Sequence, residues 1–195
     1  MNVRWILLLG VALFFYGSYY SAKNFNLNAQ HSVGDALDSL NGVKVYYNGG
    51  VSHVGARNVS SDGYNIGLEY QCVEFVKRYY YEYYHHKMPD SYGHAVDFFD
   101  RGLSDGKLNS RRGLIQYSNP GTSMPQAGDL VVMDGNSLNP YGHVAIVSAV
   151  DLNGVEFIQQ NPGPFAPSRV SYSLEQTGGK WRIDRDDVLG WLRMK

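Results

Sequence analysis

Three short apolar segments in the second half of the chain constrain the fold most. The segments "GDLVVM" (128–133) and "GHVAIVSAV" (142–150) are apolar at nearly every position, and "GVEFIQQN" (154–161) follows after a short polar turn. Strands that are apolar on both faces lie in the middle of a sheet, because only there are both faces covered. With the alternating segment "VKVYYN" (43–48), they predict a sheet at the centre of the fold.

One helix is predicted upstream of these strands. Residues 49–67, "GGVSHVGARNVSSDGYNIG", are rich in glycine and turn-forming residues and predict a long irregular approach. Apolar and aromatic side chains then recur near helical spacing from Cys72 to about Tyr84, and Pro89 prevents further extension. We expect the tyrosines of "YYYEYYHH" (79–86) to cover a core, with a sugar-stacking surface as the alternative.

The N-terminal segment predicts export. Arg4 is followed by an uncharged stretch, "WILLLGVALFFYGSYYSA" (5–22), which Lys23 closes. Its length is close to the roughly 20 residues that span a bilayer, and its apolar core also fits a signal peptide. Tyr20 occupies a position where cleavage needs a small residue, so an uncleaved anchor stays open beside a cleaved signal, and a buried helix is the third alternative. We expect residues 1–22 to direct export across a bacterial inner membrane, to the periplasm or to its outward face.

Length and composition predict one folded domain after this segment. The 195 residues are 44% hydrophobic and 18% charged, with a formal net charge of −1. This balance gives no general attraction to nucleic acid, so we expect no nucleic-acid partner. The polar residues 23–42, with a weak helical pattern in 33–40, are expected to form a tether, and residues 43–195 the domain. The oligomeric state stays open.

Cys72 is the only cysteine in the chain. Exported proteins usually pair their cysteines, so a lone one is either a small buried hydrophobic side chain or a thiol retained for chemistry. At the start of a helix, unpaired backbone N–H groups and the helix dipole favour a thiolate, and the same N–H groups can receive an oxyanion. The position therefore favours a nucleophile.

His143 is the candidate base for such a nucleophile. It begins the second apolar strand and follows Gly142, which we expect to let a substrate approach closely. From spacing alone, a hydrogen-bonded structural histidine is an equal alternative. His85 and His86 are adjacent on the predicted helix, where neighbouring side chains diverge.

A metal cofactor is not expected. The remaining histidines stand alone in the sequence, and no second cysteine is present to build a thiolate zinc site. Asp62, Glu69 and Glu74 surround the cysteine, but they lack the alternating spacing of a calcium loop, which leaves calcium as a weakly supported alternative.

The motifs around these residues resemble one family. In order, "YQCVEFVKRYY", "AGDLVVM", "GHVAIVSAV" and "FIQQNPG" are similar to the CHAP domain, a cysteine- and histidine-dependent amidohydrolase/peptidase of the papain-like clan. The resemblance covers about 41–192. Within the family the chain is similar to the amidase domain of glutathionylspermidine synthetase/amidase. It implies an α+β papain-like fold in which a nucleophile-bearing helix packs on an antiparallel sheet, with Cys72 and His143 as the catalytic pair.

The third catalytic position departs from the family pattern. CHAP domains usually carry a glutamate followed two residues later by an asparagine, where this sequence has Gln159 and Asn161. An amide oxygen can still accept the imidazole N–H, as in papain-type Cys-His-Asn sites, but it brings no negative charge.

The hairpin turn predicts which of these two residues orients His143. The segment "LNG" (152–154) suits a three-residue loop with the glycine in the left-handed region, which pairs Asp151 with Val155. Asn161 then becomes the diagonal neighbour of His143, and Gln159 lies one pair further along. We therefore expect Asn161 to orient the imidazole more strongly than Gln159.

The implied reaction is hydrolysis of an amide bond through an acyl-enzyme. The Cys72 thiolate attacks the carbonyl, its backbone N–H with help from Gln71 holds the oxyanion, and His143 protonates the leaving amine. Tyr70 and Gly142 complete the expected substrate-binding residues. For Gln71, a helix-capping or core-bordering amide is an equal alternative.

Export and family together predict a peptidoglycan or related peptide-amide substrate. Two other functions stay open: a glutathionylspermidine-type amidase, and a catalytically impaired CHAP fold that binds cell wall. The sequence does not specify which amide bond is cut.

Overall fold

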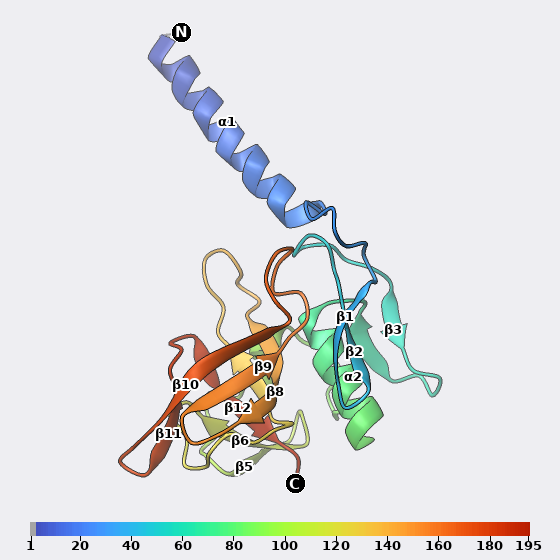
Figure 1. Cartoon of the computed structure of the whole chain (residues 1–195), viewed down its shortest axis with the longest axis vertical. Coiled ribbons are helices and arrows are strands. Elements are labelled where there is room, and N and C mark those ends of the chain that lie inside the picture. The colour runs from blue at the N-terminus through green and yellow to red at the C-terminus, as the bar shows by residue number, and fades with distance from the viewer. Residues whose placement is uncertain (1–2) are drawn as a thin grey trace.

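An eight-stranded antiparallel sheet forms the centre of the fold, in a computed structural model that describes residues 3–195 (Figure 1). The strands follow the order β11-β10-β9-β8-β7-β12-β6-β5 across the sheet. β7 and β8 therefore lie in the middle, as their apolar sequences predicted. The strand bounds are β5 Lys107–Asn109, β6 Leu114–Ser118, β7 Leu130–Met133, β8 His143–Val150, β9 Gly154–Ile158, β10 Arg169–Thr177, β11 Lys180–Ile183 and β12 Val188–Arg193.

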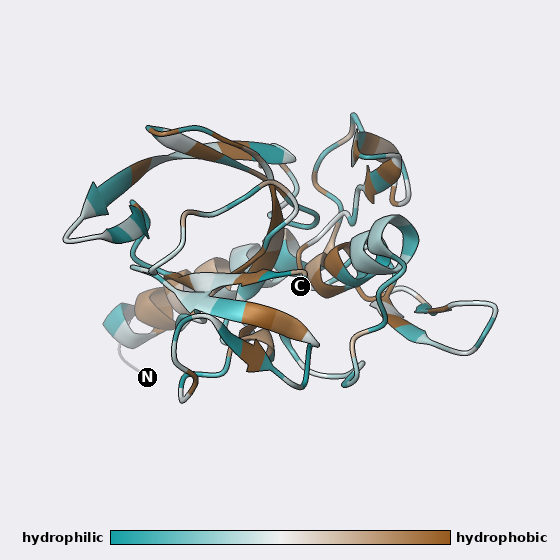
Figure 2. Cartoon of the chain, turned by 90° about the horizontal axis from the view of Figure 1, so that it is seen from below, coloured by the Kyte–Doolittle hydropathy of each residue, from teal (hydrophilic) through white to brown (hydrophobic). Residues whose placement is uncertain are grey.

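β7 and β8 are apolar on both faces because each face of the sheet covers a core. Val132 and Val144 pack on the side of the helix α2 (Cys72–Tyr84), whereas Val131 and Ala145 belong to a second core on the opposite face. Alternate residues of a strand point to opposite faces, so a strand between two cores must be apolar throughout. Figure 2 shows the strong curvature of this sheet and the apolar residues along its strands.

The helix α2 lies between the large sheet and two small hairpins. It contacts β8 as well as β2 and β4. One hairpin pairs β1 (Ala36–Leu40) with β2 (Val43–Tyr46), and the other pairs β3 (Arg57–Val59) with β4 (Asn65–Leu68). A short 3-10 helix, η1, spans Ala95–Phe98. The predicted bounds of α2 and the α+β class, with a helix packed on an antiparallel sheet, are confirmed.

The tyrosines of α2 mostly cover the core, as expected. Tyr79 and Tyr80 are fully buried, whereas Tyr83 is 46% exposed. The hydroxyl of Tyr80 lies 3.0 Å from the backbone oxygen of Gly128 and 3.2 Å from that of Leu192, and it can donate to either. This hydroxyl therefore links the middle of α2 to the segment before β7 and to the end of β12.

The N-terminal helix α1 (Val3–Asn24) projects away from the domain (Figure 1). Its large apolar side chains face outward, with Leu7 64% and Phe14 71% exposed. By length and composition it can cross a membrane, a property that it shares with signal sequences at the same position. At its base, the backbone N–H of Ser52 donates to the Lys23 carbonyl at 2.9 Å.

The predicted tether, residues 23–42, is not free of regular structure. Its weak helical pattern falls on β1, which forms a strand because it pairs with β2. Leu40 faces Val43 across a two-residue turn in which Asn41 and Gly42 both have positive φ, 50° and 85°. Asn-Gly is the preferred sequence for this turn, and its hairpin signal outweighs the helical spacing.

Tyr80→Phe should destabilise the folded protein by about 1–2 kcal/mol, because it removes the donor for two buried backbone carbonyls. Urea denaturation of the full chain in detergent measures the change in the free energy of unfolding. Tyr83→Phe is the matched control and should change that free energy by less than about 0.5 kcal/mol. Equal effects of the two substitutions would show that the buried hydroxyl does not contribute.

Candidate active site

The first turn of α2 places Cys72 against the start of β8. The half-buried thiol packs at the edge of the core between α2 and the sheet. The backbone N–H of Val144 is hydrogen-bonded to this thiol, and Val144 directly follows His143. The structure therefore brings the predicted nucleophile and the predicted base to the same end of the sheet.

Gln159 fixes the imidazole of His143. Nε2 of His143 lies 3.0 Å from Oε1 of Gln159, and Nε2 of Gln159 donates to the backbone oxygen of Pro167 at 3.2 Å. Because the amide nitrogen is directed at a carbonyl, the amide oxygen faces the ring, and the ring Nε2 must carry the hydrogen. Nδ1 then keeps its lone pair, which is the state that a general base needs.

The observed hairpin register differs from the predicted one. Val150 faces Val155, where Asp151 was predicted, and a bulge then shifts the pairing further. Asp151 instead accepts the backbone N–H groups of Asn153 and Gly154 at 2.8 Å each. Gly154 does not have the positive φ that the predicted turn requires. The register therefore shifts by one residue in the loop, which is one residue longer than predicted, and by one more at the bulge inside β8.

This register makes Gln159 the residue that meets His143. Ile146 faces Ile158, so Gln159, the residue that directly follows β9, is placed opposite Ala145. Gln159 is then one diagonal step from His143, the place that the prediction gave to Asn161. Polar side chains on diagonal neighbours can reach each other across a sheet.

Asn161 supports the start of α2 instead of the imidazole. Its Nδ2 donates to Oε1 of Gln71 at 3.0 Å and to the backbone oxygen of Val51 at 2.9 Å. Nε2 of Gln71 donates in turn to the backbone oxygen of His53. The side chain of Gln71 makes no helix-capping hydrogen bond, so the capping alternative is wrong. Its amide is held from both sides, directly before the cysteine.

Gln160 is the site residue that the sequence analysis missed. It is fully buried, and its Nε2 donates to the backbone oxygen of Gln71 at 3.0 Å and to Oε2 of Glu74 at 2.9 Å. Its Oε1 accepts the backbone N–H of Tyr46 at 2.7 Å. Glu74 is itself paired with Arg78 at 2.6 Å. Three consecutive amides, "QQN", at the end of a strand are the sequence signal that marks this junction.

Gly142 and Tyr70, which were expected to bind substrate, both have structural roles. Gly142 has a φ of 72°, and a Cβ there would lie 2.5 Å from the backbone oxygen of Met133. Packing therefore requires this glycine, and the expected reason, substrate approach, is not needed to explain it. Tyr70 also has a positive φ, 65°, and its ring packs on Tyr46 with 5.5 Å between centroids.

Burial sets the resting protonation states of the pair. It raises the pKa of the Cys72 thiol, although the backbone N–H groups of Val144, Val73 and Cys72 act to lower it. Burial also lowers the pKa of His143 to about 4, against the hydrogen bond to Gln159, which raises it. At neutral pH both groups are uncharged, which differs from the thiolate expected from the helix position. If the sulfur acts as a nucleophile, its proton must move to a base during the attack.

A salt bridge that the sequence analysis missed lies close to the imidazole. Arg185 and Asp187 pair with each other, and they shift the pKa of His143 in opposite directions, Arg185 downward and Asp187 upward. Because their effects oppose, burial remains the main influence on the ring.

The other titratable residues singled out from the sequence serve local structure. His86 Nε2 lies 2.8 Å from the backbone oxygen of Arg112, and His94 caps η1. Asp62 pairs with Lys87, as Glu74 does with Arg78. Among residues 3–195 there is no group of three His, Cys, Asp or Glu side chains placed to hold a metal ion.

A cleft of about 650 Å³ opens between segments 28–31 and 164–168. Tyr47 and Ser168 line this cleft and also a smaller hollow that contains Gln159 and Asn161. The cleft therefore adjoins the residues that support the catalytic pair, and it has room for part of a substrate.

The CHAP domain family model matches residues 59–161, which is more than half of the chain and includes Cys72, His143, Gln159 and Asn161. The chain belongs to the CHAP family. This membership supports a function among the peptidoglycan hydrolases and amidases.

Comparison with individual proteins gives partial matches to this CHAP chain. It is 28% identical to trypanothione synthetase from Crithidia fasciculata over 149 residues, which covers 71% of the chain and 22% of that protein. It is 29% identical to glutathionylspermidine synthase from the same organism over 139 residues, which covers 67% of the chain and 19% of that protein. The chain thus spans about a fifth of the length of these curated relatives.

Among solved structures, two of Ly7917 are similar in part. The crystal structure of Ly7917 matches with 28% identity and a TM-score of 0.31, covering 50% of the chain and 41% of Ly7917. The crystal structure of Ly7917 with the hydrolyzing product of MDP matches with 37% identity and a TM-score of 0.28, covering 37% of the chain and 29% of Ly7917.

The lowered pKa of His143 predicts a loss of stability in acid. The unfolded chain protonates this ring near pH 6.5, whereas the folded protein resists protonation until about pH 4, so stability falls as the pH drops between these values. Urea denaturation should show that the wild type loses roughly 2–3 kcal/mol more than His143→Asn between pH 7 and 4.5. Parallel losses in the two proteins would contradict the buried neutral imidazole.

Proposed function

We propose that this CHAP protein hydrolyses amide bonds of peptidoglycan, with Cys72 as nucleophile and His143 as general base and acid. The observation that carries the proposal is the hydrogen bond between His143 Nε2 and Gln159 Oε1, 3.0 Å long. It leaves Nδ1 as a proton acceptor on a ring that lies beside the cysteine-bearing turn of α2.

The reaction begins from a neutral thiol and a neutral imidazole. As the sulfur of Cys72 bonds to the substrate carbonyl carbon, its proton moves to Nδ1 of His143, and the carbonyl oxygen becomes negative. The imidazolium then gives this proton to the leaving amine, and the C–N bond breaks. Water attacks the thioester with His143 again as base, which releases the acid and restores the thiol.

The start of α2 supplies the donors for the oxyanion. The first N–H groups of a helix have no partner within the helix, and a negative oxygen is favoured at this end of the helix dipole. The amide of Gln71 is positioned beside them by Asn161 and by the backbone oxygen of His53. We assign the oxyanion to the backbone N–H of Cys72 and the side-chain amide of Gln71.

The amide of Gln159 replaces the carboxylate usual in the family. Its oxygen accepts the imidazole N–H and fixes the tautomer, which is the orienting function of the third residue in papain-type sites. Since this contact is formed, the impaired wall-binding alternative has less support than catalysis.

The location that we propose is the outer side of the inner membrane, with α1 as the anchor. The helix is free of charge from Trp5 to Ala22, and its 22 residues extend for about 33 Å, close to the hydrocarbon thickness of a bilayer. Peptidoglycan lies on that side of the membrane, so the proposed location gives the protein access to the proposed substrate.

A second candidate is an amidase that acts on glutathionylspermidine-type conjugates. It is favoured by the similarity to the trypanothione and glutathionylspermidine enzymes of Crithidia fasciculata. The two candidates share the catalytic chemistry and differ in the acyl and amine groups that the cleft accepts.

Cys72→Ala should abolish amide hydrolysis while the fold is kept, because a small change at a helix start leaves only a small cavity. Purified sacculi and a glutathionylspermidine conjugate are incubated separately with the full chain, and new amine and carboxyl ends are identified by mass spectrometry. His85→Asn, which changes an exposed histidine at the opposite end of α2, is the control and should remain active. Cleavage of sacculi by the alanine variant would end the cysteine mechanism, and cleavage of the conjugate alone would favour the second candidate.

Gln159→Ala should lower kcat by roughly ten- to a thousand-fold, because the ring loses the acceptor that fixes it. Gln159→Glu should raise the pKa of His143, since a carboxylate stabilises the imidazolium, and the acid limb of the kcat/KM profile should move to higher pH. Asn161→Ala should leave that limb in place, because Asn161 contacts Gln71 and not the imidazole. If the acid limb moves in Asn161→Ala and stays in place in Gln159→Glu, Asn161 and not Gln159 orients the imidazole.

A further inference from the structure

The base of α1 is attached to the loops that surround the catalytic residues. The Lys23 carbonyl accepts the N–H of Ser52 at 2.9 Å, and the Lys23 ammonium donates to the carbonyl of Leu138 at 2.6 Å. A Cβ on Gly50 would lie 2.5 Å from the same Lys23 carbonyl, so only glycine permits this contact. The helix and the loops 48–55 and 135–142 are therefore joined directly, without a flexible spacer.

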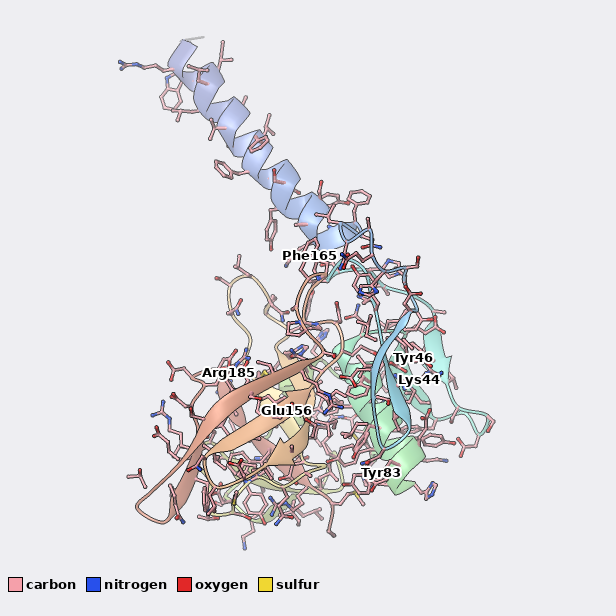
Figure 3. All side chains as sticks on the ribbon, in the orientation of Figure 1. Lys44, Tyr46, Tyr83, Glu156, Phe165 and Arg185 are labelled. Atoms are coloured by element: carbon pink, nitrogen blue, oxygen red, sulfur yellow. The ribbon has the colours of Figure 1, made fainter. Side chains whose placement is uncertain are left out.

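A third loop lies at the same end of the domain. Asn28, shortly after α1, donates to the carbonyl of Pro164 in loop 161–168 at 2.9 Å. Figure 3 shows Phe165 of this loop beside the base of α1. Tyr83, at the C-terminal end of α2, lies on the far side of the domain from α1. Cys72, at the other end of that helix, is thus on the side of the domain that faces α1.

Each of these three loops exposes a large apolar side chain. Val54 is 60% exposed, Leu138 is 64% exposed and Phe165 is 71% exposed. In the segment that joins α1 to the domain, Phe25 is 57% and Leu27 is 51% exposed. Single exposed apolar residues are ordinary, but five of them around the base of one apolar helix form a group that requires an explanation.

Apart from Lys23 at the base of α1, the segments of this region contain no charged side chain. Segments 24–34, 48–55, 135–142 and 161–168 together hold 35 residues without any Asp, Glu, Lys or Arg, although 18% of the chain is charged, which would give about six. A surface that faces water normally carries such charges. Their absence and the apolar loop tips both fit contact with lipid, since charged groups are costly to bring into the apolar part of a bilayer.

We propose that these loops dock on the bilayer surface and hold the catalytic site at the membrane. The inference rests on α1 as a membrane anchor, because an inserted α1 brings Lys23, and the loops bonded to it, to the level of the lipid head groups. Val54, Leu138 and Phe165 then enter the interface between head groups and acyl chains.

The docking loops also support the catalytic residues. The backbone oxygen of Val51 accepts from Asn161, that of His53 accepts from Gln71, and that of Pro167 accepts from Gln159. Contact of these loops with lipid would therefore affect the positions of Gln159, Gln71 and Asn161, which support the proposed base and oxyanion site. The substrate amides that reach this site are those held near the membrane surface.

Depth-dependent fluorescence quenching tests the proposal. In the full chain with Cys72→Ala, a polarity-sensitive fluorophore is attached to a single Leu138→Cys or Phe165→Cys, and the protein is reconstituted in phosphatidylcholine/phosphatidylglycerol vesicles. The matched control is Leu152→Cys, because Leu152 is as exposed as Phe165, 71%, and lies in the β8–β9 loop at the opposite end of β8 from His143. All three side chains are exposed, so the substitutions should not disturb folding.

The expected result is strong quenching by nitroxide-labelled acyl chains at positions 138 and 165, at least threefold above position 152, with protection there from iodide. Labels at 138 and 165 that behave like the control, while α1 resists carbonate extraction, would overturn loop docking and leave the anchor standing. Carbonate-extractable protein would overturn both. Protection from iodide without quenching by lipid would show that a second copy of the chain, and not the bilayer, covers the loops.

Discussion

The buried amide of Gln160 joins the two halves of the fold at the point where the active site forms. It binds the start of α2 through Gln71 and Glu74, and the hairpin of β2 through Tyr46. An unpaired amide in this position would cost about 1–3 kcal/mol for each lost group, so the helix, the hairpin and the sheet must be in register together. Cys72, the proposed nucleophile, is held against β8 only when this junction is complete.

The candidate active site is built from uncharged partners, and its protonation states reflect this composition. Gln159, Gln71 and Asn161 orient and hold their neighbours through amides, which a desolvated site accepts at lower cost than carboxylates. Burial beside these neutral partners lowers the pKa of His143 and raises the pKa of the Cys72 thiol, so both groups are uncharged at neutral pH. The proposed reactivity of Cys72 therefore depends more on how the thiol and the imidazole are oriented than on a permanent thiolate–imidazolium ion pair.

Local patterns predicted the helix and the central strands, because spacing and apolar periodicity report on neighbours in the sequence, whereas the pairing of Cys72 with His143 came from the resemblance to the CHAP family. The orienting residue was assigned wrongly because the choice between Gln159 and Asn161 depends on the hairpin register, which shifts by one residue in the loop and by one more at a bulge in β8. That bulge is stabilised at Ser148, whose hydroxyl donates to the backbone and the carboxylate of Glu156 at 3.1 and 2.7 Å. Such a contact between two strands cannot be seen in the periodicity of either one.

The close attachment of α1 limits the reach of the domain. A free linker of the 20 residues from 23 to 42 could span up to about 70 Å, enough to explore a large volume. Here much of that segment is folded onto the domain, through the bonds of Lys23 and Asn28 and through β1. With α1 in a bilayer, the domain can reach substrates only within about its own width of the membrane surface. Turnover then depends on how fast substrate enters that region.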